Sequence, residues 1–157
     1  MRFSFHPFAL SFAFLVAPTV LCQVASDPGC SIEKGYYQCN RAAFLTRLNE
    51  ARTTAVVSKP FDQGTTNSLS RLVRTLHKTE IPAAAGADLT FVLIKAQAEG
   101  IFYGPSQREL ASLLVYSRDP EGGGGKIIWI ETFDGEPDIV WPIVVFNIIR
   151  QFKTSIQ

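Results

Sequence analysis

The chain has few residues of the types that carry out covalent or metal chemistry. Its 157 residues include three cysteines, Cys22, Cys30 and Cys39, and two histidines, His6 and His77. A structural metal site needs three or four ligands held together. This sparse spacing does not supply them, so we expect no metal site and no cofactor. Two nearby thiols can instead form a disulfide, but only if the protein folds in an oxidising compartment.

The start of the chain indicates such a compartment. Arg2 gives a basic start, residues 8–17 form an apolar run, and small residues follow, which is the layout of a secretory signal peptide. The apolar run ends at Pro18 and is about ten residues long, whereas a membrane-spanning helix needs roughly 20. The alternative interpretation is an uncleaved membrane anchor.

Two cleavage sites fit the small-residue rule, one after Cys22 and one after Ser26. We expect residues 1–22 to be the signal peptide and residues 23–157 to be a single domain. Either cut removes the first cysteine, so the secreted domain keeps two.

The composition of the secreted domain predicts one disulfide and a balanced charge. Cys30 and Cys39 remain, and in an oxidising compartment they most simply pair with each other. Closing this short loop stabilises the fold by at most roughly 2.7 kcal/mol in the chain-entropy model. Removing Arg2 from the 15 basic residues leaves 14, against 14 acidic ones. A protein that binds mainly through phosphate contacts usually has a basic excess, so this balance argues against nucleic acid as the main ligand.

Charge is nevertheless unevenly distributed. Most charged residues in 41–78 are basic, and most charged residues in 119–138 are acidic. The two stretches are either two solvated faces, or the first is a basic patch for an anionic or acidic partner.

Helical periodicity marks two segments that would position these residues. Residues 42–57 have apolar side chains at helical spacing and follow Asn40, a suitable cap. Residues 68–79 repeat the pattern with the stripe Leu69, Leu72, Val73 and Leu76. We expect two amphipathic helices separated by a loop.

The pattern then changes to that of strands. Residues 89–95, 110–118 and 126–132 are rich in β-branched and apolar side chains, with a short strand and turn at 100–105 and a glycine-rich loop at 119–125. This order predicts an α+β fold in which an N-terminal helix, with a second short helix, packs on a central antiparallel β-sheet.

The apolar run that contains Trp141, residues 139–149, contains a proline and is followed by basic residues. We expect a buried strand or a docked terminal segment, and the alternative is an exposed patch for a partner.

A short motif links these elements to a known family. Tyr37 and Cys39 stand soon after the signal peptide and just before a helix, and a late hairpin closes the sheet. In these features the chain resembles the ribonuclease-like secreted effectors of powdery mildew fungi that are associated with haustoria. The resemblance implies the fold of fungal guanyl-specific ribonucleases, in which a small disulfide loop precedes the helix. Two departures are the absence of a partner cysteine near the C-terminus and the additional second helix.

The resemblance also implies where catalytic groups of an active ribonuclease would lie. It puts a base carboxylate in the strand 89–93, an arginine near Leu113, an acid histidine near Glu131 and a further histidine near Phe61. The chain has only the carboxylate of Glu131. Because acid–base catalysis needs both groups within hydrogen-bond reach, we expect no catalytic site. The alternative is a rearranged pair of Glu131 and Glu99.

A surface would then perform the function. Aromatic side chains can stack on bases or serve as core, and arginines can bind an anionic partner. The candidate surface for RNA or a protein partner comprises Arg41, Arg47, Arg52, Phe102, Tyr103, Tyr116, Trp129 and Glu131.

We therefore expect a secreted, catalytically inactive ribonuclease-like fungal effector that promotes virulence. Its partner would be a host protein or, alternatively, host RNA. It would be a monomer without membrane contact after signal cleavage, acting outside the host cell or after entry into it. Two other functions are an active secreted ribonuclease and an unrelated small secreted binding domain.

Overall fold

The computed structural model describes residues 29–33, 36–82, 84–98, 108–118, 125–135 and 139–157. The expected signal peptide and both cleavage sites lie outside these residues. So do the expected strand and turn at 100–105 and most of the glycine-rich loop at 119–125.

The described chain begins with a disulfide-closed hairpin. Strands β1 (Cys30–Glu33) and β2 (Tyr36–Cys39) pair antiparallel, with Cys30 opposite Cys39. The two sulfur atoms are bonded at 2.04 Å, which confirms the expected disulfide. The hairpin contacts the last strand of the main sheet, and Cys39 packs against the edge of the core.

The first helix, α1 (Arg41–Glu50), begins where its cap requires. The side chain of Asn40 accepts a hydrogen bond from the backbone N–H of Ala43, at 3.0 Å, which satisfies a helix-end donor that would otherwise lack a partner. Phe44 and Leu48 lie one turn apart and are buried. They attach α1 to the core.

The helix ends at Glu50, so the expectation of a helix over 42–57 is wrong in its second half. Residues Thr53–Lys59 form strand β3 instead. The run Thr53-Thr54-Ala55-Val56-Val57 is rich in β-branched side chains, which favour a pleated strand over a helix.

The second helix, α2 (Gln63–Thr75), also has a capping side chain. The Asp62 carboxylate accepts from the backbone N–H of Thr65 at 2.6 Å, and hydrogen bonds from Thr65 lower the pKa of that carboxyl below its ordinary value. Leu69, Leu72 and Val73 are buried, which confirms the predicted stripe. The cap starts the helix at Gln63, within the segment expected to be a loop.

The main sheet has five strands in the order β4-β3-β5-β6-β7. The remaining strands are β4 (Thr79–Glu80), β5 (Leu89–Ala98), β6 (Arg108–Ser117) and β7 (Lys126–Asp134), and a short 3-10 turn, η1 (Ala84–Gly86), precedes β5. Strands β5, β6 and β7 pair antiparallel, as expected.

The sheet is mixed, however, because β3 pairs parallel with both β4 and β5. The expectation of a wholly antiparallel sheet is therefore wrong. Since parallel neighbours need a crossover connection, the chain passes through α2 between β3 and β5. The expected α+β class and the packing of helices on a sheet are confirmed.

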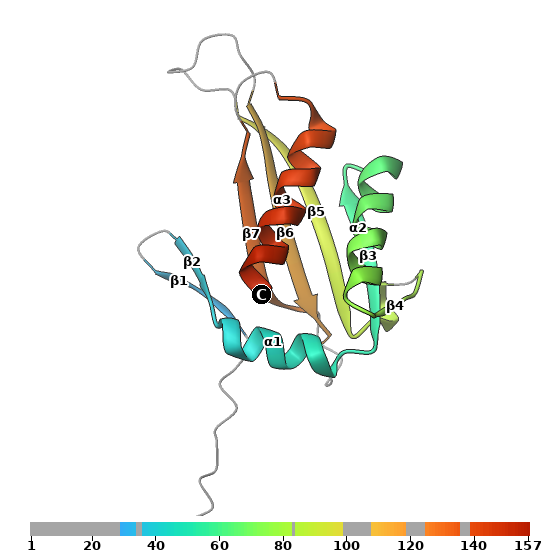
Figure 1. Ribbon diagram of the computed structural model, residues 1–157. Helices are drawn as coiled ribbons and strands as arrows, with labels where there is room; N and C mark the ends of the chain where they lie inside the picture. Colours follow the sequence, from blue (N-terminus) through green and yellow to red (C-terminus); the bar gives the residue numbers. More distant parts are fainter. Residues whose placement is uncertain (1–28, 34–35, 83, 99–107, 119–124, 136–138) are drawn as a thin grey trace, which may run out of the picture.

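The C-terminal segment is a helix rather than a strand. Helix α3 (Trp141–Ile156) has Pro142 in its first turn. A backbone N–H at that position would have no partner within the helix, so proline is tolerated there. The expected buried strand is therefore wrong, and the expected docked terminal segment is confirmed. In Figure 1, α3 and α2 lie side by side over one face of the sheet, and α1 crosses its lower end.

Four aromatic rings connect these layers. The rings of Phe44 in α1 and Trp129 in β7 stack with centroids 4.7 Å apart. Phe152 of α3 meets Phe44 edge-on at 6.1 Å and Phe91 of β5 at 5.9 Å. All four side chains are buried. The core therefore joins both ends of the described chain to the middle of the sheet.

Asp88 joins three strand ends. Its carboxylate oxygen Oδ2 accepts from the backbone N–H groups of Arg52 and Thr53 and from the Thr53 hydroxyl, at 2.9 to 3.0 Å. Its carbonyl accepts from the N–H of Arg118, just after β6. The hydrogen bonds from Thr53 and Arg52 hold the pKa of the Asp88 carboxyl below its ordinary value.

We predict that Thr54→Val stabilises the protein. The Thr54 side chain is fully buried and its hydroxyl oxygen has no hydrogen-bond partner among the described residues. Removing an unsatisfied buried hydroxyl should raise the free energy of unfolding by about 1 kcal/mol, measured by urea denaturation. The matched control is Thr53→Val, which removes the hydroxyl bonded to Asp88 and should lower it. A destabilised Thr54→Val protein would show that the hydroxyl has a partner.

We predict that Asp88→Asn destabilises the protein in a pH-dependent way. The folded state lowers the pKa of Asp88, so its charged form contributes stability above the unfolded pKa of about 4. The loss should be about 1.5 kcal/mol near pH 7. It should shrink as the pH falls below about 4 and through the lower folded pKa, because the wild-type carboxylate is then protonated. Equal losses at pH 7 and at the lowest pH that preserves folding would contradict this role.

Candidate functional site

The three arginines of the expected surface lie in α1 or just after it and have different hydrogen-bond partners. The Nε of Arg41 donates to the carbonyl of Ser155 at 2.8 Å, and the Nε of Arg47 donates to the hydroxyl of Ser117 at 2.8 Å. Arg52 is exposed and its backbone N–H binds Asp88. Two of the three side chains thus connect α1 to distant elements of the fold.

The aromatic residues of the expected surface are separated. Phe102 and Tyr103 lie outside the described residues. Trp129 is buried on the helix-covered side of the sheet, where it stacks on Phe44. Tyr116 alternates with the buried Val115 and lies half-buried on the opposite side. The structure therefore places Trp129 in the core and does not bring it together with Tyr116.

Glu131 is a residue of β7, and its side chain lies between that strand and α3. Its carboxylate accepts from Trp129 Nε1 at 3.3 Å, from the Ser155 hydroxyl at 3.0 Å and from Gln151 Nε2. These contacts connect the C-terminal half of α3 to the edge strand. Glu99, its suggested catalytic partner, lies outside the described residues.

The other positions implied by the ribonuclease resemblance hold no carboxylate, arginine or histidine. In the strand 89–93, Leu89, Phe91 and Leu93 are fully buried, as is Leu113 in β6. Phe61 is 76% exposed on the loop before α2.

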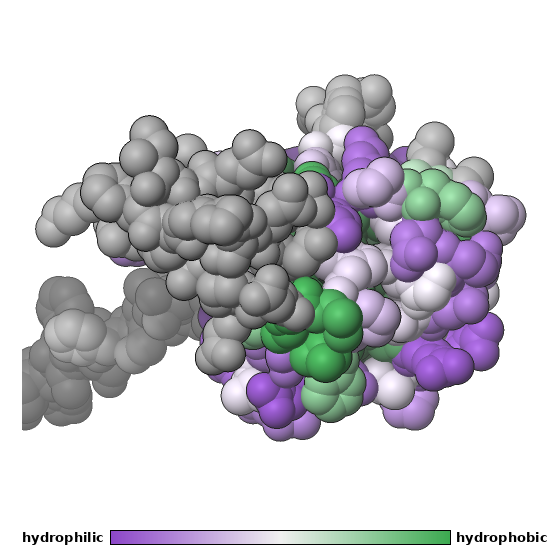
Figure 2. Space-filling view, turned by 90° about the horizontal axis from the view of Figure 1, so that it is seen from above, coloured by the Kyte–Doolittle hydropathy of each residue, from purple (hydrophilic) through white to green (hydrophobic). Residues whose placement is uncertain are grey.

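The most unusual surface lies on α3. Val140, which precedes the first residue of α3 as its N-cap, is followed at intervals of three residues by Ile143 and Phe146 on the outside of the helix. The three side chains are 58%, 49% and 63% exposed. Figure 2, which looks onto the end of the molecule where α3 begins, shows strongly apolar side chains gathered there in one cluster. Large apolar side chains grouped in the open usually mark an interaction site. We call these three residues the apolar row.

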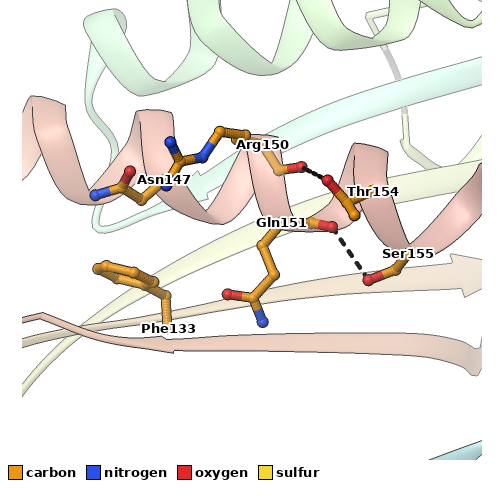
Figure 3. A pocket seen from close by; sticks show the side chains of 6 residues that line it. All are labelled: Phe133, Asn147, Arg150, Gln151, Thr154 and Ser155. Atoms are coloured by element: carbon orange, nitrogen blue, oxygen red, sulfur yellow. Dashed lines mark hydrogen bonds between the residues drawn. The ribbon is translucent and has the colours of Figure 1, made fainter.

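A shallow groove continues this surface between α3 and β7. Its volume is about 360 Å³. Figure 3 shows Gln151 reaching from α3 toward β7, while Phe133 extends from β7 toward the helix. The lining residues are Phe133, Asn147, Arg150, Gln151, Thr154 and Ser155.

One arginine lies where the apolar row meets the groove. The Arg150 guanidinium carbon is 5.8 Å from the centre of the Phe146 ring, a cation–π distance. In the described part of the chain, the Arg150 side chain forms no ion pair. Helix α3 contains no acidic residue, and its two cations are Arg150 and Lys153. The surface is thus apolar at one end and basic beyond it.

The sequence indicated this surface in the run 139–149, for which an exposed patch for a partner was the alternative expectation. The structure divides the run between two roles. Val144, Val145 and Ile148 are buried, whereas Ile143 and Phe146 are exposed. Only helical periodicity separates these sets, so a strand interpretation could not find the apolar row.

The sheet face without helices carries a second, less exposed apolar feature. Val57, Val92, Leu114 and Ile130 are consecutive partners across four strands. Val92 is only 7% exposed and the others are half-buried. These four side chains are less exposed than those of the apolar row.

Within the described ranges, no three His, Cys, Asp or Glu side chains are grouped as a metal site would need. The helices of the described chain are also too short or too polar to cross a membrane.

Comparison with known proteins identifies no family. No protein-family model matches the chain, and no curated protein matches it. Among solved structures, the chain is similar to lipoprotein GNA1162 from Neisseria meningitidis, with 14% identity and a TM-score of 0.33. The match covers 66% of this chain and 99% of the lipoprotein. A TM-score this low supports no argument about fold or function.

We predict opposite effects on stability from two neighbouring positions on α3. Ile148→Ala should lower the free energy of unfolding by about 2 to 5 kcal/mol, because Ile148 is fully buried. Phe146→Ala should change it by no more than about 0.5 kcal/mol, because Phe146 is mostly exposed. Urea denaturation of both proteins measures the difference. A large loss for Phe146→Ala would mean that this ring belongs to the core.

Proposed function

We propose that this protein is a secreted, non-enzymatic binding protein that acts on a protein of a host organism. The observation that carries the proposal is the apolar row at the start of α3, Val140, Ile143 and Phe146, exposed beside the groove between α3 and β7. Exposing three large apolar side chains does not stabilise the fold, since they gain no burial there. Covering them with a partner would remove that surface from water.

The resemblance to powdery mildew effectors supports a host protein as the partner. Its supports are the signal-like start, the Tyr37 and Cys39 motif, and a disulfide-closed hairpin directly before α1. The antiparallel strands β5, β6 and β7 suit a ribonuclease-like sheet. The parallel pair of β3 and β5, with α2 and α3, would then be additions to that plan.

The absence of catalysis is also part of the proposal. Buried leucines and Phe91 occupy strand positions where the resemblance would require polar groups. The carboxylate of Glu131 is engaged by three donors from β7 and α3. A protein partner has more support than RNA, because Trp129 is in the core.

Affinity capture from plant host extract tests the proposal. The tagged protein, secreted by a eukaryotic expression host, is compared with Phe146→Asp and with the control Phe61→Asp, which adds the same charge to an exposed aromatic outside α3. We expect wild type and Phe61→Asp to retain a common protein. Phe146→Asp should retain it at least tenfold less, since central aromatic contacts dominate protein interfaces.

Two results would overturn the proposal. If wild type and Phe146→Asp capture the same proteins, or if neither captures any, the apolar row does not bind a host protein. Robust cleavage of total RNA by the purified protein, abolished by Glu131→Gln, would establish an enzyme instead.

A further inference from the structure

The outward side of α3 changes character along its length. Its first half exposes Ile143 and Phe146, and its second half exposes Arg150, Gln151 and Thr154. A partner that covers the whole side would therefore lie on apolar side chains in the first half of α3 and on polar and basic side chains in its second half.

The charged side chains that α3 itself carries have one sign. Arg150 and Lys153 are the charged residues of α3. The nearby carboxylate of Glu131 is turned between the sheet and the helix, where Gln151 and Ser155 donate to it. An incoming carboxylate would thus find a cation on α3 and no acidic residue of that helix.

The position of Arg150 favours recognition of a carboxylate next to an apolar contact. Its guanidinium lies at the Phe146 ring, and a guanidinium can bind both oxygens of a carboxylate in a fork-like pair. Burying Phe146 under a partner would also exclude water from this ion pair and strengthen it. In the groove, the amide of Asn147 can bind the backbone of the same partner segment. The Gln151 amide nitrogen already donates to Glu131 and to the Thr132 carbonyl, and the Thr154 hydroxyl donates to the Arg150 carbonyl.

We propose that α3 binds an acidic amphipathic segment of a partner protein, with apolar side chains on Ile143 and Phe146 and a carboxylate on Arg150. This inference rests on the proposed binding function and specifies the chemistry of the partner. A second copy of the chain fits less well, because paired α3 helices would bring cations together without acids. A membrane surface also fits less well, since membrane-binding helices usually carry many cations and α3 has two.

Selection from a library of random peptides displayed on phage tests this chemistry without a known partner. Wild-type protein should enrich peptides that combine aliphatic or aromatic residues with Asp or Glu. The best peptide is then synthesised, together with a version in which its acids are replaced by the corresponding amides. Binding of each is measured by fluorescence polarisation to wild type, Arg150→Glu, Arg150→Gln and the control Arg74→Glu, which changes an exposed arginine on α2.

We expect Arg150→Glu to weaken binding of the acidic peptide about tenfold or more, with Arg150→Gln intermediate and Arg74→Glu unchanged. The amide version should bind wild type and Arg150→Glu equally, because the lost ion pair is then absent from both.

Several outcomes would overturn the inference. Enrichment without acids, equal binding to Arg150→Glu, or no enrichment would each do so. If peptides without acids are enriched and fail to bind Phe146→Asp, the proposed function stands and only the acidic partner is wrong. A concentration-dependent dimer abolished by Phe146→Asp would assign the surface to a second copy. Co-sedimentation with phosphatidylserine vesicles, abolished by both Phe146→Asp and Arg150→Glu, would assign it to a membrane.

Discussion

The stacking of Phe44 on Trp129 is the contact on which the rest of the fold depends. It brings the first helix against the last strand, and Phe152 then closes the cluster from the last helix. Phe91 extends the contact to the centre of the sheet. Aromatic pairs at these separations contribute beyond the area they bury. Residues far apart in the chain are thus held in one core, and the orientation of α3 follows from it.

The surface of α3 is a consequence of how that helix is held. Ile148 and Phe152 point into the core, and Gln151 and Ser155 donate to Glu131 on β7. With these contacts made, the helix cannot rotate, so Ile143 remains outside. A protein with an exposed apolar cluster risks association with itself. The cation of Arg150 lies beside this cluster, and in the proposed binding it would select partners by charge.

The sequence patterns predicted the elements whose signals are local. The disulfide followed from two cysteines, the stripe of α2 from its periodicity, and strands β5, β6 and β7 from their β-branched runs. Pairing was harder, because nothing local in β3 specifies a parallel neighbour, and its alanine and valines also fit helical spacing. Pro142 suggested a break in α3, although proline in a first turn is compatible with a helix. An exposed patch in the run 139–149 was the alternative expectation, but the residues of the apolar row could not be named, because they depend on which side of α3 faces outward.

The same reasoning explains why the expected surface residues separated. Trp129 and Tyr116 both lie in strands, and an aromatic in a strand faces either the core or solvent according to its register. The register here, with an irregularity between Val115 and Tyr116, sends Trp129 to the helices and Tyr116 to the other face. That distinction requires the paired strands and cannot be made from one strand alone.

Site-specific photo-crosslinking tests the central claim, that the outward side of α3 is a protein-binding surface. A photoreactive phenylalanine analogue replaces Phe146 in one sample and Arg74 in another, and each protein is irradiated in host extract. The account predicts a discrete protein adduct from position 146 and none from position 74. Equal adducts from both positions, or none from position 146, would contradict it.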